Sequence, residues 1–178
     1  MQGQYGSLRA AEKKRAARMQ NESMNASLGS QDIGNLTKRD LFILGIGLYW
    51  GEGYKRGNNE FGFSNADPDM IRMFLRWVNE IYDIKTEDLI LRLSINSAYA
   101  HKVNESIRFW INVTGVSRSQ FTKTSLIKTK LRKYDPHNSR PYFGTLRIKV
   151  RRATQLHRRV LGSLAYLSQS VAKTMTQI

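Results

Sequence analysis

A row of alternating cations near the C-terminal end is the first feature that could do chemistry. Residues 145–151 read Thr-Leu-Arg-Ile-Lys-Val-Arg. Successive side chains of a strand point to opposite faces, so the three aliphatic residues would share one face and Arg147, Lys149 and Arg151 the other. Cations on such a ribbon meet phosphates or guanine edges in a DNA groove. The alternative is an ordinary strand with a solvated outer face.

The overall charge favours the binding interpretation. The chain carries a net charge of +15, and residues 117–159 hold 13 Lys and Arg against one acid. Clustering of this kind is typical of a surface that binds a polyanion. We predict a DNA-binding surface that also includes further cations: Lys55, Arg56, Arg92, Lys130, Arg132, Lys133 and Arg140.

A glycine-rich apolar segment at residues 44–53 is the second feature. Glycine in a helix costs about 1 kcal/mol relative to alanine, so several glycines in one helix need a compensating role. Leu44, Gly47, Leu48 and Gly51 fall on one helical stripe, which predicts close approach of a second copy of this helix in a homodimer. The alternative is that the glycines pack on the sheet of their own chain.

Glu52 ends this segment. In a homodimer it would lie beside its partner copy, and two carboxylates that face a phosphate backbone suit Mg²⁺ or Mn²⁺. The chain has no cysteine, so any metal ligands are oxygen or histidine. If the glycines pack within the chain, Glu52 is instead a solvated residue at a helix end.

The remaining elements follow from periodicity and turn residues. We expect a basic helix at 7–19, a linker at 21–35, a helix from Thr37 to about 51–53, a hairpin of 54–56 with 60–64, and a helix from Asp67. These are followed by a strand at 89–95, a helix at 101–114, a strand at 120–127, a basic loop at 128–142, a strand at 145–151 and a helix at 153–167. Trp77, Trp110 and Tyr82 are expected in the core, and His101 and His157 on helix surfaces.

This order predicts an α+β fold in which helices cover one face of a mostly antiparallel sheet and leave the other face free. We expect three parts: an N-terminal helix and linker at 1–36, a DNA-binding domain at 37–170 and a tail at 171–178. The polar N-terminus has no secretory signal, and the apolar run at 41–50 is shorter than the roughly 20 residues that span a bilayer. A cytoplasmic protein without membrane contact is expected.

Residues 47–53, Gly-Leu-Tyr-Trp-Gly-Glu-Gly, resemble the second part of the motif that names the LAGLIDADG homing endonucleases. The following Tyr54-Lys55, the strand 61–65 and the Asp67-Pro68 helix start are also similar to that family. The resemblance covers 37–167 by order of elements and 41–82 by residues. It departs from the family where Trp50 replaces an acid, where Gly45-Ile46 replaces Leu-Ala, and where a helix stands at 101–114.

The resemblance implies a LAGLIDADG-type domain with a saddle-shaped sheet over the major groove of double-stranded DNA. One copy of the motif implies a homodimer, with Glu52 as ligand of the catalytic divalent metal. Asn65 stands near a position that orders the attacking water, and Lys123 or Lys128 is the candidate for the family's lysine late in the sheet.

Three functions agree with these observations. The first is a site-specific double-strand DNA endonuclease dependent on a divalent metal, and the second is a non-catalytic DNA-binding regulator on the same fold. An RNA-binding splicing helper is the third. Metal binding at Glu52 and DNA cleavage separate the first from the second, and a preference for structured RNA reveals the third.

Overall fold

The computed structural model describes residues 2–55, 60–130 and 141–175, and the chain divides into two compact units, Met1–Thr37 and Lys38–Ile178. This division lies one residue from the predicted boundary at 36. No helix among the described residues is long and apolar enough to cross a membrane.

The N-terminal unit is one helix, α1 (Gln2–Ile33), so the predicted linker at 21–35 is wrong. The Ser, Asn and Gly residues there are interspersed with Glu, Met, Ala and Leu, which favour helix. Side-chain pairs one turn apart add support, because Arg18 pairs with Glu22 and Asn25 with Asn21. The side chains from Leu8 to Ile33 are exposed.

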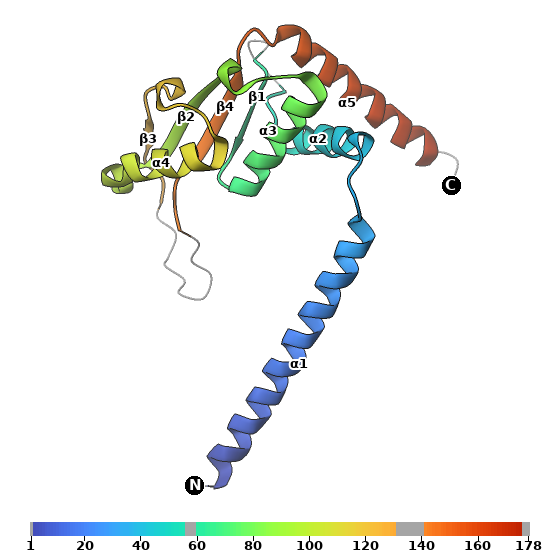
Figure 1. Ribbon diagram of the computed structural model, residues 1–178, viewed down its shortest axis with the longest axis vertical. Coiled ribbons are helices and arrows are strands. Elements are labelled where there is room, and N and C mark those ends of the chain that lie inside the picture. The colour runs from blue at the N-terminus through green and yellow to red at the C-terminus, as the bar shows by residue number, and fades with distance from the viewer. Residues whose placement is uncertain (1, 56–59, 131–140, 176–178) are drawn as a thin grey trace. The chain divides into compact units, whose positions relative to one another are not determined.

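The second unit is α+β, as predicted (Figure 1). Its α-helices are α2 (Lys38–Glu52), α3 (Pro68–Tyr82), α4 (Val103–Thr114) and α5 (Thr154–Met175). Its strands are β1 (Gly62–Asn65), β2 (Leu89–Asn96), β3 (Ser125–Ile127) and β4 (Thr145–Val150). Short 3₁₀ turns, Thr86–Asp88, Ser97–Lys102 and Arg118–Gln120, precede β2, α4 and β3.

The four strands form one mixed sheet in the order β1-β4-β2-β3. β4 pairs antiparallel with both β1 and β2, whereas β3 lies parallel to β2. The register places Ser64, Arg147 and Arg92 in one row across β1, β4 and β2, and it places Gly62, Lys149 and Ile90 in the next row. Most of the pairing is antiparallel, as expected.

Helices cover one face of this sheet. Alternate residues of β2 and β4 are buried there, and α2, α3 and α4 pack on the strands while α5 packs against α2. The core contains Phe61 and Phe63, which alternate inward as predicted, and Trp77 and Trp110, which are fully buried. His157 on α5 is also buried, so its predicted surface position is wrong.

Local signals set most element boundaries correctly. α2 begins one residue after Thr37 and ends at Glu52. The Asp67 carboxylate accepts a hydrogen bond from the Asp69 backbone N–H at the start of α3, and Pro68 occupies the first helical position. Gly115 ends α4 in the left-handed conformation (φ +68°).

Four further predicted elements differ from the structure. Tyr54 and Lys55 form no strand, although Gly53 before them makes one bridge with Phe63, and Arg56 lies outside the described residues. The strand at 120–127 shortens to β3. The predicted helix at 101–114 begins as a 3₁₀ turn and becomes α-helical at Val103. α5 continues eight residues past 167 to Met175, so the expected tail at 171–178 is helical through Met175.

Candidate nucleic-acid interface

The face of the sheet opposite the helices carries two cations of the predicted row, Arg147 and Lys149, whereas Arg151 lies past the end of β4. Arg147 and Lys149 on β4 are partly exposed, while the aliphatic residues between them are buried. Arg92 on β2 is exposed and lies opposite Arg147 in the strand register. The alternation therefore places three cations from two neighbouring strands on one open face.

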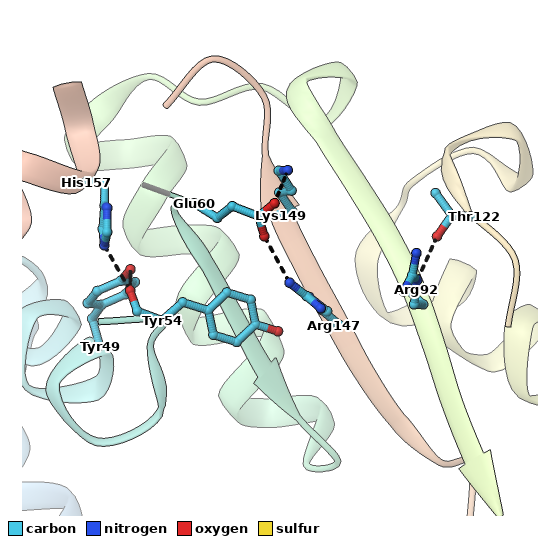
Figure 2. A network of polar contacts seen from close by, with 8 residues as sticks. All are labelled: Tyr49, Tyr54, Glu60, Arg92, Thr122, Arg147, Lys149 and His157. Atoms are coloured by element: carbon cyan, nitrogen blue, oxygen red, sulfur yellow. Dashed lines mark hydrogen bonds and ion pairs between the residues drawn. The ribbon is translucent and has the colours of Figure 1, made fainter. Parts of the chain in front are cut away.

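Glu60 lies among these cations, just before β1 (Figure 2). Its carboxylate accepts a hydrogen bond from a terminal nitrogen of Arg147 at 2.9 Å and pairs with the Lys149 ammonium through its other oxygen. The Glu60 side chain is 29% exposed. These contacts, above all the hydrogen bond from Lys149, lower the pKa of Glu60 below its ordinary value.

Tyr54 supports Arg147 from another side. The Arg147 guanidinium carbon lies 4.8 Å from the centre of the Tyr54 ring, a cation–π contact. A Cβ atom on Gly62 would come within 2.7 Å of this ring, so glycine leaves room for Tyr54 above β1. Burial raises the pKa of Tyr54, and the Arg147 charge opposes this only in part. Arg147 is thus held by an anion and an aromatic ring.

The Tyr54 backbone is itself fixed from the core. Its carbonyl accepts hydrogen bonds from the Tyr49 hydroxyl on α2 and from Nε2 of His157 on α5, the latter at 2.9 Å. Nδ1 of the same ring is buried and has no hydrogen-bond partner among the described residues. α2 and α5 therefore position Tyr54, and Tyr54 in turn supports Arg147.

A hollow of about 300 Å³ lies on this open face. Glu60, Arg147 and Lys149 line it from the β1–β4 side, and Arg92 and Thr122 line it from the β2 side. Arg92 Nε donates to the Thr122 hydroxyl at 3.4 Å, a long hydrogen bond that Figure 2 shows on the side of β2 away from β4. The hollow is therefore bordered by three cations and one carboxylate.

The other predicted DNA-binding residues are dispersed. Arg151 is exposed one residue past the end of β4, and Lys130 is exposed beyond β3. Lys55 donates to the carbonyl oxygens of Trp50 and Gly51, so it caps the C-terminus of α2. The remaining predicted cations lie outside the described residues: Arg56, Arg132, Lys133 and Arg140.

The glycines of α2 divide into two groups. Gly45 is buried, and a Cβ atom there would fall 2.1 Å from the Trp77 ring, so this glycine serves the chain's own core. A Cβ atom on Gly47 or Gly51 would meet nothing within 4 Å, and both residues are exposed. Intrachain packing therefore accounts for the first glycine and not for the other two.

The predicted dimer stripe is correspondingly exposed. Leu44 is 43% exposed and Leu48 is half-buried, and Ile43 and Trp50 on the same side of α2 are 40% and 42% exposed. Large apolar residues that gather on one exposed side of a helix, unlike scattered ones, are typical of an interaction surface. This side of α2 is therefore an exposed apolar face that includes Gly47 and Gly51.

Glu52 lies exposed at the end of α2, next to the Gly53 bridge at the β1 edge of the sheet. It makes no hydrogen bond or ion pair with any described residue. The described part of the chain also contains no cluster of three or more His, Asp or Glu that could hold a metal ion. The described residues of one chain therefore offer one unpaired carboxylate here, that of Glu52.

The other predicted catalytic residues do not gather at Glu52. Asn65 accepts a hydrogen bond from the Asp67 backbone N–H and lies opposite buried Leu146, so it shapes the turn into α3. Lys123 and Lys128 are exposed on either side of β3, at the opposite edge of the sheet from β1. Within one chain, none of the three is brought to the Glu52 carboxylate.

Sequence reasoning missed Glu60, Tyr54, Thr122 and His157. Glu60 alternates with Phe61 and Phe63, which identifies its face, but its partners on β4 depend on pairing across 87 and 89 residues. No local pattern encodes that pairing.

Comparisons with models of protein families, with curated proteins and with solved structures find no match for this chain.

Proposed function

We propose that this protein binds double-stranded DNA through the open face of its sheet. The observation that carries the proposal is the row of Arg147, Lys149 and Arg92 on a face that is not needed for the core. Cations held on adjacent strands meet phosphates and base edges when a β-ribbon enters a groove. The net charge of +15 supports a polyanionic partner.

Duplex DNA fits this surface better than duplex RNA. The major groove of B-form DNA admits a two-stranded ribbon, whereas the deep, narrow major groove of A-form RNA excludes side chains. β4 and β2 are the two central strands of the sheet, and Arg147 and Arg92 lie in register on them. Recognition of single-stranded RNA relies on exposed aromatic platforms, whereas the ring that contacts these cations among the described residues, Tyr54, is half-buried.

We also propose that the protein acts as a homodimer through α2. The support is the apolar face of Ile43, Leu44 and Trp50, with Gly47 and Gly51 open to close approach. A two-fold axis through this face would bring two glycine surfaces together and bury the apolar residues around them. Two open sheet faces would then be available to one duplex, which lengthens the contact.

DNA hydrolysis is a second candidate function, and it depends on Glu52. The resemblance to LAGLIDADG endonucleases implies it, and an exposed carboxylate at the end of α2, without a partner among the described residues, supports it. The oxygen donors of two Glu52 side chains, one from each subunit, suit Mg²⁺ or Mn²⁺. Such an ion, when bound, supplies a Lewis acid and lowers the pKa of its water. The two carboxylates would hold the ion beside the scissile phosphate.

A non-catalytic DNA-binding regulator is the alternative. Asn65, Lys123 and Lys128 are not gathered around Glu52, so a single chain supplies no further side chain from the predicted set to order an attacking water. The same open face and dimer helix would serve this function. DNA binding is therefore the primary proposal, and cleavage is decided separately.

Binding is tested by fluorescence anisotropy with short duplex DNA, hairpin RNA and single-stranded DNA over a range of salt. We expect the tightest binding to duplex DNA, with log K falling linearly against log salt. Equal or tighter binding to structured RNA would favour the splicing-helper function, and absence of binding to any duplex DNA at low salt would contradict the proposal.

Cleavage is tested with a plasmid library in Mg²⁺ or Mn²⁺, with wild type beside Glu52→Gln. Double-strand cuts that the variant loses while it keeps its DNA affinity would establish hydrolysis at Glu52. Equal binding by both proteins without cuts supports the regulator.

A further inference from the structure

Glu60 is an anion at the centre of a surface proposed to bind a polyanion. The open strands near it supply Arg147, Lys149 and Arg92, and the Glu60 carboxylate pairs with the first two. A carboxylate in these positions occupies donors that would otherwise meet phosphate oxygens. If the surface bound only the phosphates of the DNA backbone, Glu60 would lower its affinity for DNA.

Base edges, unlike phosphates, accommodate such a carboxylate. In the major groove a guanine presents two acceptors, N7 and O6, and its cytosine partner presents the N4 amino donor. An arginine donates to the guanine and a carboxylate accepts from the cytosine. Glu60 and Arg147 offer this donor–acceptor pair side by side, 2.9 Å apart.

The position of Arg147 favours base reading as well. Its guanidinium is fixed by Glu60 on one side and by the Tyr54 ring on another, and Tyr54 is anchored through its carbonyl to α2 and α5. The contact with Glu60 engages one terminal nitrogen of a group with five N–H donors. A guanidinium restrained in this way is suited to directional hydrogen bonds, because less freedom is lost on binding.

We propose that Glu60 is a specificity-determining residue that aims Arg147 at a G·C base pair and penalises binding to arbitrary DNA. This inference rests on the proposed DNA-binding function. Glu60 lowers the affinity of the open face for phosphates, so duplexes that lack a G·C pair at the right place bind weakly.

The test compares full-length wild type with Glu60→Gln, which keeps the shape of the side chain and removes its charge. Glu105→Gln is the matched control, because Glu105 is an exposed acid on α4, on the helix side of the sheet. Glu60→Ala serves as a second variant in case one substitution perturbs folding, and thermal melting checks that every variant is folded.

We expect Glu60→Gln to bind duplexes of random sequence about 3- to 10-fold more tightly than wild type, with a slope of log K against log salt steeper by about 1 to 2. Glu105→Gln should show a much smaller change. In selection from a random duplex library followed by sequencing, wild type should enrich a G·C pair at a fixed position of each half-site. Glu60→Gln and Glu60→Ala should lose that enrichment.

The outcomes separate the two proposals. If wild type binds duplex DNA and a folded Glu60→Gln protein binds random duplexes no more tightly and selects the same sites, the inference about Glu60 is wrong while DNA binding stands. If neither protein binds duplex DNA, both proposals fail. A gain in affinity equal to that of Glu105→Gln would assign the effect to net charge alone and would also refute the specific role of Glu60.

Discussion

Replacing Gly47 by alanine separates the two explanations for the glycines of α2. Within one chain the added Cβ atom would meet nothing within 4 Å, so it encounters no steric resistance. Alanine is favoured over glycine in a helix interior by about 0.8–1 kcal/mol, and we expect the isolated subunit to become more stable by this amount. In a unit of this size the gain raises Tm by about 3–5 °C.

The same methyl group should weaken the proposed dimer. Glycines at a helix crossing allow the two backbones to approach, and overpacking of such a contact costs about 1–3 kcal/mol. That corresponds to a self-association constant weaker by about 5- to 150-fold. Analytical ultracentrifugation over a concentration series measures the association, and melting at low protein concentration measures the stability of the subunit.

Gly45→Ala is the matched control on the same helix. Its Cβ atom would fall 2.1 Å from the Trp77 ring, so this variant should be destabilised by about 1–3 kcal/mol or more. An unchanged self-association constant in Gly47→Ala would refute close packing at this face. A chain that is monomeric at every concentration would refute the homodimer itself.

Three further predictions concern stability. The pKa of the Glu60 carboxyl is lowered below its ordinary value of 4.5, so its ion pairs stabilise the fold above that pH and are lost as pH falls through the lowered pKa. The difference in unfolding free energy between wild type and Glu60→Gln should therefore shrink in acid. Urea titrations at several pH values measure this difference. Trp77→Ala should cost about 3–5 kcal/mol in urea unfolding, because the ring is fully buried; a loss below 1 kcal/mol would mean that the site is not core. Gly144→Ala should lower the free energy of unfolding by more than about 1 kcal/mol in the same assay. The reason is that residue 144 has φ +72° and that a Cβ atom there would lie 2.5 Å from the Ser94 carbonyl oxygen. Equal stability of variant and wild type would contradict this backbone geometry.

Elements with strong local signals were predicted correctly from the sequence. The Asp67-Pro68 start of α3, the Gly115 end of α4 and the alternation of β4 depend on residues that are adjacent in the chain. The predicted linker at 21–35 is wrong because a helix that is exposed on all sides shows no apolar periodicity, and its Ser, Asn and Gly residues resemble those of a linker.

The candidate site was predicted only in part, because it depends on strand register. Arg147 and Lys149 were identified from alternation within one strand, whereas their contact with Glu60 requires β1 to pair with β4 across more than 80 residues. The glycine pattern raised two explanations that the sequence left open. The structure assigns Gly45 to the core and leaves Gly47 and Gly51 exposed, a distinction that depends on where Trp77 lies in space.

The claim that the open sheet face binds duplex DNA is tested most directly by removing its two central cations. The variant Arg147→Gln/Lys149→Gln is compared with Arg72→Gln/Arg76→Gln, which makes the same change in charge at two exposed, ion-paired arginines of α3 on the helix side. Duplex affinity and its salt dependence are measured for both by anisotropy. We predict that the β4 variant loses about ten-fold or more in affinity and that its salt slope becomes shallower by about 1 to 2, with little change in the α3 variant. Equal losses in the two variants would contradict the assignment of this face as the DNA-binding surface.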